Sequence, residues 1–251
     1  MRCSIIVPAR FASTRFPGKP LHHIAGKPLI QHVWERCRLC RLTDRILVAT
    51  DDTRIAETAS AFGAEVIMTS PHHQSGTDRI AEAASALPPD HHIINVQGDE
   101  PLVSPELIDR IADTLLHGPD SIGMVTAVHP LHSDEERHDP NVVKCTMSRS
   151  GRALYFSRSP IPFARGHHQE MTWWRHMGIY GYRRSFLSQF VQWPPSPLEV
   201  TESLEQLRAL ENDATIHCLV TSHGSPGIDT PEQAAALETL LASQPNPDSV
   251  V

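Results

Sequence analysis

Apolar runs alternate with amphipathic stretches through the first part of the chain. The short runs Cys3–Ala9, Arg45–Thr50 and Glu65–Met68 predict β-strands, because each is rich in apolar residues and is followed by turn or capping residues. Between these runs the apolar residues recur at helical spacing, namely Leu29, Ile30, Val33, Trp34 and Cys37, and then Ile55, Ala59 and Phe62. The order strand, helix, strand, helix, strand predicts the start of a parallel sheet.

Helix-start signals support the same alternation as far as residue 120. Asp51 and Asp52 can cap the second helix, and Ser104-Pro105 offers a capping residue followed by proline at the first helical position. A helix over about 77–87 and the buried strand His92–Val96 lie between these two signals. We therefore expect a Rossmann-like, mostly parallel, doubly wound α/β sheet that helices cover on both faces.

The pattern changes after residue 120. Strand-like stretches follow one another with few helices between them, at Met124–His129, Val142–Met147, Ala153–Ser157 and Met177–Tyr182. A helical pattern returns at Glu199–Leu210, a strand follows at Thr215–Val220, and Thr230–Gln233 reads as a capping box that opens a last helix. We expect an α/β core of residues 1–120 plus 199–243, a β-rich insertion over 121–198 and a frayed tail over 244–251.

Composition narrows the class of protein. The chain has 251 residues, of which 40% are hydrophobic and 20% charged, so it can build a large core. No apolar run approaches the length of a membrane span, and Ile5–Ala9 is too short for the core of a signal peptide. Five scattered cysteines indicate reduced thiols rather than a disulfide framework. These features predict a soluble cytoplasmic protein without membrane insertion.

The charge is distributed unevenly. The net charge is −7, yet residues 1–45 carry nine lysines and arginines against two acidic residues. A basic N-terminal segment in an otherwise acidic chain favours a small anionic ligand, such as a phosphate compound, over nucleic acid.

The loop after the first strand is the strongest candidate for that ligand. Pro8–Leu21 places Arg10, Arg15 and Lys19 at the carboxyl end of the strand, where open α/β sheets bind ligands. Three cations and the free backbone N–H groups of a turn could hold a triphosphate there. The alternative is a solvated basic loop. The spacing matches neither a Walker A motif nor the G-x-G-x-x-G fingerprint, and the second absence disfavours a nicotinamide dehydrogenase.

Acidic residues follow another buried strand. Asp99 and Glu100 stand at the end of Ile93–Gln97, and a carboxylate in that position can hold Mg²⁺ together with substrate phosphates. Asp229 offers a second carboxylate, although an aspartate before Thr-Pro is equally typical of a helix start. The Cys37-x-x-Cys40 pair has no second pair, and the histidine doublets lack the spacing of a helical metal site, so neither indicates zinc.

Taken together, these motifs resemble the 3-deoxy-manno-octulosonate (Kdo) cytidylyltransferase family, the enzymes that make CMP-Kdo for lipopolysaccharide biosynthesis. The resemblance runs nearly end to end and rests on residues 9–21, 48–52, 73–79, 95–101, 153–158, 175–182, 195–199, 204–208 and 228–232. The first loop alone indicates a sugar nucleotidyltransferase, and the later segments indicate the Kdo branch. The implied fold is that of the nucleotide-diphospho-sugar transferases, and the implied reaction is Mg²⁺-dependent transfer of CMP from CTP to Kdo.

The resemblance also implies roles for individual residues. The implied nucleotide-binding residues are Pro8, Ala9, Arg10, Ser13, Arg15, Lys19, Gln74 and Ser75. Kdo would be met by Arg79, Gln97, Arg158, His176, Tyr180, Glu205 and Gln206. Asp99 and Asp229 would hold Mg²⁺, and together with Arg15 and Lys19 they form the implied catalytic group. The insertion would make a homodimer and close over the sugar site.

Two other functions fit parts of this pattern. A metal-dependent glycosyltransferase of similar architecture would hold the metal of a nucleotide-sugar donor through Asp51-Asp52 or Asp99-Glu100. A catalytically silent sugar-nucleotide sensor would keep the basic loop but could dispense with both metal-binding acids, and the presence of Asp99 and Asp229 disfavours it.

Overall fold

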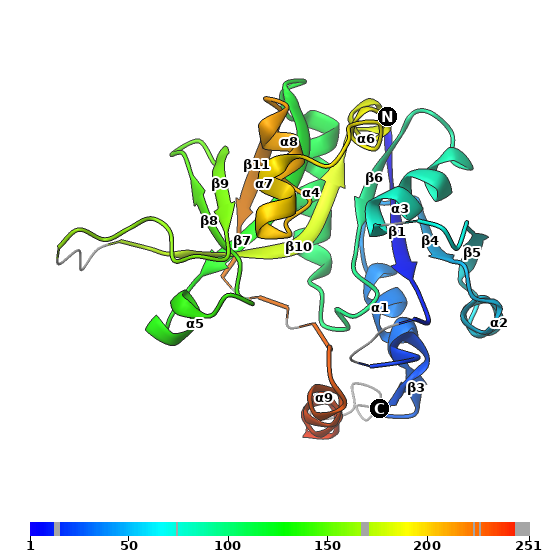
Figure 1. Cartoon of the computed structure of the whole chain (residues 1–251). Coiled ribbons are helices and arrows are strands. Elements are labelled where there is room, and N and C mark those ends of the chain that lie inside the picture. The colour runs from blue at the N-terminus through cyan, green and yellow to red at the C-terminus, as the bar shows by residue number, and fades with distance from the viewer. Residues whose placement is uncertain (13–15, 74, 167–170, 223, 226, 244–251) are drawn as a thin grey trace.

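In a computed structural model the chain forms a twisted central sheet with helices on both faces (Figure 1). The structure describes residues 1–12, 16–73, 75–166, 171–222, 224–225 and 227–243. Across the main sheet the strands are β11 (Thr215–Val220), β7 (Ile122–Pro130), β10 (Trp174–Tyr182), β6 (His91–Asn95), β1 (Arg2–Ala9), β4 (Arg45–Thr50) and β5 (Glu65–Met68). Of these strands β10 alone is antiparallel to its neighbours. The expected mostly parallel sheet is confirmed.

Alternate residues of the inner strands bury against opposite layers of helices. On β1, Ile5 and Val7 pack into the core with α1 (Leu29–Cys37), α2 (Thr53–Ala61) and α4 (Pro105–His117). Ile6 faces the other core, built with α3 (Gly76–Ser85), α6 (Arg184–Phe190) and α8 (Leu207–Glu211). Because both faces are covered, consecutive residues of β1 from Cys3 to Val7 are all buried, and no alternation of buried and exposed residues appears.

Side-chain caps begin the core helices where the sequence places them. Asp52 accepts a hydrogen bond from the backbone N–H of Arg54 at the start of α2, and Ser104 does the same for Leu107 at the start of α4. Ser75 and Asp78 form a capping box at the start of α3. These caps satisfy backbone donors that would otherwise lack partners in the first helical turn.

The segment 121–198 contributes to the centre of the sheet as well as to its periphery. β7 and β10 lie between β11 and β6, whereas β8 (Lys144–Met147) and β9 (Ala153–Ser157) form a hairpin that extends from one end of β10 (Figure 1). This segment also contains the helices α5 (Asp134–His138) and α6. The sequence pattern did not indicate these two helices. The projecting part is therefore smaller than residues 121–198.

The chain does not form one continuous helix over residues 199–210, so that prediction is wrong. The chain forms α7 (Pro197–Glu202) and α8 instead, with Ser203 between them at φ 53°. This left-handed conformation interrupts the helix and turns Glu205 and Gln206 toward the interior. Apolar periodicity in the sequence gives no sign of this break.

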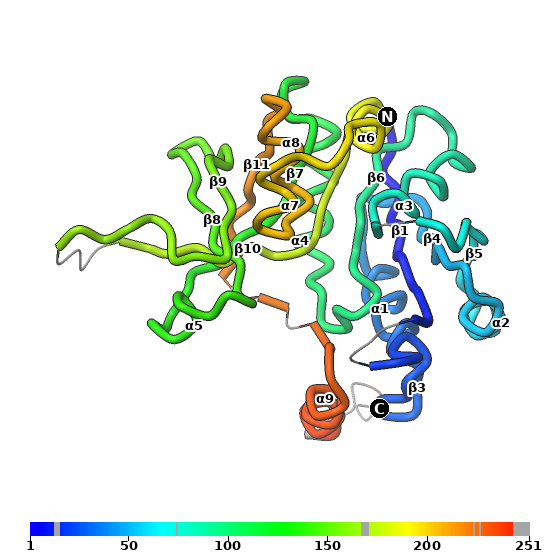
Figure 2. Tube along the Cα trace, in the orientation of Figure 1, coloured from blue at the N-terminus to red at the C-terminus, as the bar shows by residue number. Residues whose placement is uncertain are grey.

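The chain returns to its N-terminal region at the end. Figure 2 follows it from β11 past the ends of the strands to α9 (Pro231–Ser243), which contacts β2 (His23–Ile24). Ala234 and Leu237 of α9 share a buried cluster with Phe16 and Leu29.

The capping box expected at Thr230–Gln233 is present, and residues 244–251 lie outside the described part of the chain.

The five cysteines are free thiols. Among the described residues, no helix combines the length and apolar character needed to cross a bilayer.

Gly181 of β10 packs closely against α4. A Cβ at this position would lie 2.4 Å from Ile111 Cγ2 and 2.9 Å from Leu115 Cδ1. We expect Gly181→Ala to lower the free energy of unfolding by about 1–3 kcal/mol, because both neighbours are buried in a packed core. Urea unfolding measures this change, with Gly76→Ala as the control, since a Cβ there meets nothing within 4 Å. Equal effects of the two substitutions would contradict the packing argument.

Candidate active site

A polar cleft lies over the carboxyl ends of β1 and β6. It consists of two adjoining cavities of about 310 and 230 Å³, which share Pro8, Ala9, Arg10 and Gln97. The first also reaches Ser75 and Arg79, and the second reaches Lys19, Asp99 and Asp229. The cleft therefore brings together residues from the first loop, the end of β6, the start of α3 and the segment before α9.

The basic loop is folded back so that Lys19 returns to the cleft. The backbone N–H of Gly18 donates to Phe11 O at 3.1 Å, and the φ of 71° at Gly18 favours glycine. The guanidinium of Arg54 lies 3.4 Å from the centre of the Phe11 ring, and Asp52 holds Arg54 through an ion pair of 2.6 Å. Arg10 lines both cavities, while Ser13 and Arg15 lie outside the described residues.

Lys19, Asp99 and Asp229 converge on one point. The Lys19 Nζ donates to Asp99 Oδ2 at 2.6 Å and to Asp229 Oδ1 at 3.1 Å. The backbone N–H of Ile228 donates to Asp99 O at 2.8 Å, and this bond ties the segment before α9 to the end of β6. The sequence offered Asp229 equally as a helix-start residue, and the fold places its carboxylate beside that of Asp99.

The two carboxylates could hold a divalent metal. Their oxygens face a common positive group, here the Lys19 ammonium, and carboxylate oxygens are ligands that Mg²⁺ prefers. Within the ranges that the structure covers, no group of three or more His, Cys, Asp or Glu side chains forms a protein-only metal cage. A two-carboxylate site suits Mg²⁺, which usually keeps water and substrate phosphates among its ligands.

Asp51 and Asp52 have other partners. Asp52 caps α2 and pairs with Arg54, and Asp51 Oδ1 lies 3.2 Å from Arg79 Nη2. Both carboxylates are thus engaged by arginines, which disfavours them as the metal site of a glycosyltransferase.

The start of α3 forms one wall of the larger cavity. Ser75 and Gly76 line it, and the backbone N–H groups of a helix start favour an anion or a hydrogen-bond acceptor. The Ser75 hydroxyl accepts from the N–H of Asp78, so its cap fixes this wall. Gln74 lies outside the described residues.

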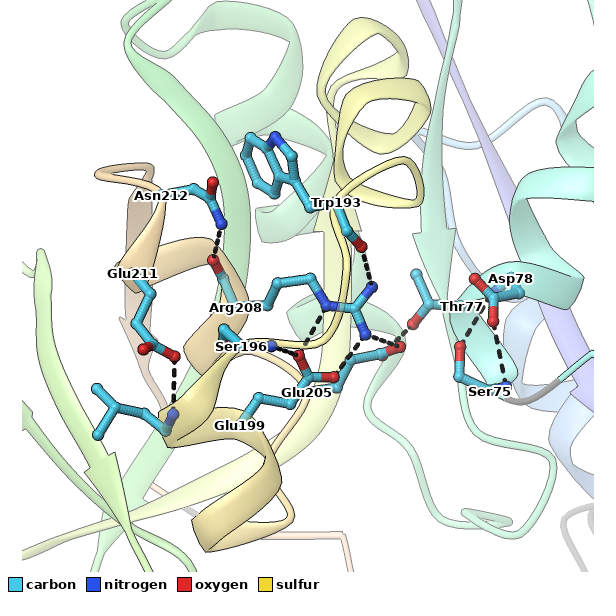
Figure 3. A network of polar contacts seen from close by, with 11 residues as sticks. Ser75, Thr77, Asp78, Trp193, Ser196, Glu199, Glu205, Arg208, Glu211 and Asn212 are labelled. Atoms are coloured by element: carbon cyan, nitrogen blue, oxygen red, sulfur yellow. Dashed lines mark hydrogen bonds and ion pairs between the residues drawn. The ribbon is translucent and has the colours of Figure 1, made fainter.

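A buried network joins α3 to α7 and α8 (Figure 3). Arg208 donates through Nε to Glu199 Oε2 at 2.8 Å, and its Nη2 also lies 3.8 Å from Glu205 Oε1. Thr77 Oγ1 of α3 donates to Glu205 Oε2. Burial raises the pKa of Glu205, whereas the hydrogen bonds from Thr77 and Ser75 and the nearby Arg208 charge lower it. The network holds Glu205 next to the wall of the larger cavity.

Several buried polar atoms near the cleft lack a hydrogen-bond partner within the described part of the chain. They are Asn95 Oδ1, Glu100 Oε2, Glu205 Oε1 and Gln206 Nε2. A buried polar atom without a partner is costly, so this group is consistent with a polar ligand in the vicinity.

The residues expected to bind a sugar divide into two groups. Arg79 and Gln97 line the larger cavity, and Gln97 Nε2 donates to Gly178 O of β10 at 3.2 Å. The rings of His176 and Tyr180 contact each other farther along β10, with centres 5.5 Å apart and planes inclined by 46°. Gln206 is buried beside Glu205.

Arg158 lies outside the lining of both cavities. Its guanidinium donates to the backbone carbonyls of Glu202, Pro140 and Ser203, so in this structure it joins the end of β9 to the turn after α7. It could reach a carboxylate in the cleft only by exchanging these contacts.

Three side chains near the site were not singled out from the sequence. Thr77 and Arg208 hold Glu205, and Thr126 of β7 contacts His176. Thr77 and Arg208 stand inside motifs that carry the family resemblance, whereas nothing in the local sequence marks Thr126, which is a buried threonine on a strand.

Comparison with known proteins identifies the family. A family model for cytidylyltransferases matches residues 4–216. The 3-deoxy-manno-octulosonate cytidylyltransferase of Marinobacter nauticus is 50% identical over 256 residues, which cover 96% of this chain and 97% of that protein. The chain belongs to the 3-deoxy-manno-octulosonate cytidylyltransferase family. It is therefore a nucleotidyltransferase, as the motif resemblance implied.

Other members and solved structures agree with this assignment. The 3-deoxy-manno-octulosonate cytidylyltransferase of Thermodesulfovibrio yellowstonii is 47% identical and covers 94% of this chain and 96% of its own length. A solved CMP:2-keto-3-deoxy-manno-octonic acid synthetase complexed with CTP superposes with a TM-score of 0.92 at 39% identity, covering 96% of this chain and 99% of that chain. A cytidylyltransferase from Leptospira borgpetersenii, with a TM-score of 0.68 at 20% identity over 98% of this chain and 89% of its own, shares the fold. The expected fold of this cytidylyltransferase family member is confirmed.

Glu100 makes the stability of this cytidylyltransferase family member depend on pH. Burial and the neighbouring charge of Asp99 raise the pKa of Glu100 from about 4.5 to about 8. Between these values the folded protein holds a proton that the unfolded chain has released, so the free energy of unfolding falls as pH rises, by at most about 1.4 kcal/mol per pH unit. We expect Glu100→Gln to flatten this dependence between pH 5 and 8.

Urea unfolding at a series of pH values checks this prediction. Glu57→Gln, on the exposed side of α2, is the matched control and should leave the wild-type slope unchanged. If Glu100→Gln follows the same pH dependence as the wild type, Glu100 is ionised in the folded protein.

Proposed function

We propose that the protein transfers CMP from CTP to the anomeric hydroxyl of Kdo and releases pyrophosphate. The observation that carries this proposal is the convergence of Lys19, Asp99 and Asp229 at the end of the basic loop, because it supplies both a phosphate-binding cation and a carboxylate pair. The identity of the substrates follows from relatives that are named for this reaction and cover almost the whole chain.

Catalysis of this reaction requires positioning and neutralisation of charge. The hydroxyl must attack the α-phosphorus in line with the departing pyrophosphate, and charge accumulates on the phosphate oxygens. Arg10 and Lys19 both line the smaller cavity, where they can stabilise that charge, and Arg15 of the same loop is proposed to share this role. Lys19 would exchange its carboxylate partners for phosphate oxygens when CTP enters.

Asp99 and Asp229 are the residues that would hold Mg²⁺. Bound there, Mg²⁺ would neutralise phosphate charge and lower the pKa of the attacking hydroxyl, so that no strong side-chain base is needed. The carboxylates would keep the metal at the end of β6, beside Lys19.

The base and the sugar would occupy different parts of the larger cavity. Pro8, Ala9, Ser75 and the proposed Gln74 would surround cytosine at the start of α3. Arg79 and Gln97 would meet the sugar acid, with Glu205, Gln206, His176 and Tyr180 behind them. Arg158 would pair with the carboxylate of Kdo, since its planar fork can contact both oxygens at once.

We also propose that the protein works as a cytoplasmic homodimer. The hairpin of β8 and β9 and the loop that follows it carry exposed apolar side chains, including Leu154 and Phe163, which are 50% and 87% exposed. Burial of these side chains against a second copy would remove apolar surface from water.

Pyrophosphate release from the purified protein tests the proposed function. The reaction contains CTP, Mg²⁺ and either Kdo, 8-amino-Kdo or sialic acid, with UTP and ATP replacing CTP as controls. We expect release with CTP plus Kdo and not with UTP or ATP. Release with none of these acceptors would overturn the proposal, and hydrolysis of a nucleotide-sugar donor would then point to a glycosyltransferase.

Loss of one carboxylate should stop the reaction without unfolding the protein. We expect Asp99→Asn to lower kcat by about 100-fold or more, because an amide is a poor ligand for Mg²⁺ and a poor partner for Lys19. Asp113→Asn is the matched control, since Asp113 lies exposed on α4 and pairs only with His117 among the described residues. Turnover of Asp99→Asn near the wild-type rate at ordinary Mg²⁺ would remove Asp99 from the metal site.

A further inference from the structure

The hydroxyl of Thr126 lies among three polar atoms of β10. Thr126 is fully buried on β7, and its Oγ1 is 3.0 Å from His176 Nε2, 3.1 Å from Met177 O and 2.9 Å from Ile179 O. The pairing of β7 with β10 shifts register between Met177 and Tyr180, so these carbonyls turn toward the threonine side chain. One side chain thus contacts both the backbone of the bulge and an imidazole ring.

The number of available protons fixes the direction of these hydrogen bonds. A threonine hydroxyl has one proton to donate and two lone pairs that accept. Carbonyl oxygens only accept, so contacts with Met177 O and Ile179 O are favourable only when the hydroxyl proton points toward them. If the proton pointed at His176 instead, the oxygen lone pairs would face two carbonyl oxygens at about 3 Å. His176 Nε2 must therefore carry the hydrogen and donate to Thr126.

The surroundings of the ring keep it neutral. The Phe156 ring packs edge-on at 4.8 Å between centres, and Tyr180 covers another side at 5.5 Å. Burial lowers the pKa of His176 to about 3. A neutral imidazole with hydrogen on Nε2 has a lone pair on Nδ1, and Nδ1 makes no hydrogen bond with any of the described residues.

We propose that Thr126 is a positioning residue that holds His176 in the Nε2–H tautomer, so that Nδ1 accepts a hydrogen bond from a hydroxyl group of the sugar acid. The identity of that ligand rests on the proposed function, whereas the tautomer follows from the contacts of Thr126 alone. Without Thr126 the ring can exchange tautomers, and the fraction that presents an acceptor to the sugar falls.

Two variants separate the hydrogen bond from the packing. Thr126→Val has nearly the same shape and lacks the hydroxyl, and Thr126→Ser keeps the hydroxyl and loses only a methyl group. Ser4→Ala is the matched control. Ser4, near the start of β1, and His91 form another buried hydroxyl–imidazole contact, which is 2.7 Å long.

Nitrogen NMR of protein labelled with ¹⁵N-histidine reads the tautomer directly. The His176 signals are assigned by their disappearance in His176→Gln. In the wild type and in Thr126→Ser we expect a protonated Nε2 and an unprotonated Nδ1, and in Thr126→Val we expect shifts averaged toward the other tautomer. Ser4→Ala should leave the His176 signals unchanged. A hydrogen on Nδ1 in the wild type would overturn the inference, whatever the protein's activity.

Steady-state kinetics provide the second measurement. We expect Thr126→Val to raise KM for Kdo about 5-fold, the equivalent of one ordinary hydrogen bond, while KM for CTP stays unchanged. Thr126→Ser should restore the wild-type value. Equal increases in both KM values would indicate a general loss of structure and overturn the positioning role. Absence of CMP-Kdo formation by the wild type would instead contradict the proposed function and leave the NMR result standing.

Discussion

The site depends on one ammonium group that stands between two carboxylates. Asp99 and Asp229 are far apart in sequence, and like charges at close range repel unless a cation lies between them. Lys19 provides that cation, and the backbone bond from Ile228 to Asp99 O keeps the two acidic segments in contact. Apolar side chains of α9 pack against Phe16 and Leu29 in a buried cluster that supports the same segments. Three distant parts of the chain are thus fixed at one edge of the sheet.

A second constraint acts on the opposite wall of the cleft. Arg208 and Glu199 form a nearly buried ion pair, with 8% and 12% of their side chains exposed, and the pair holds Glu205 against Thr77 of α3 (Figure 3). Such a pair contributes little net stability, but removal of one partner leaves a buried charge at a cost of about 3–5 kcal/mol. The network therefore acts less as a source of stability than as a rigid link between α8 and the start of α3.

The central antiparallel strand supports one residue of the cleft lining, Gln97, through a backbone carbonyl. β10 lies between two strands that are parallel to each other, and its bulge near Gly178 turns backbone carbonyls toward Gln97 and Thr126. A regular strand would use these carbonyls in its ladder. The irregularity thus contacts both Gln97, which lines the cavity, and Thr126, which contacts His176.

The sequence by itself determined the elements that local patterns can specify. Apolar periodicity and capping residues gave the strands and helices of the first half, and the loop from Pro8 to Leu21 gave the basic edge of the cleft, because a parallel strand places its following loop at the ligand-binding edge. The break at Ser203 was not visible, since a single left-handed residue leaves the apolar pattern on either side intact.

Only the tertiary structure decided which polar residues meet. It placed Asp229 beside Asp99, engaged Asp51 and Asp52 with arginines, and turned Arg158 toward backbone carbonyls. It also placed β7 and β10 inside the main sheet, although they come from the segment that resembles an insertion. Such pairings depend on contacts between segments remote in sequence, and the free energy of those contacts is not encoded in any local pattern of residues.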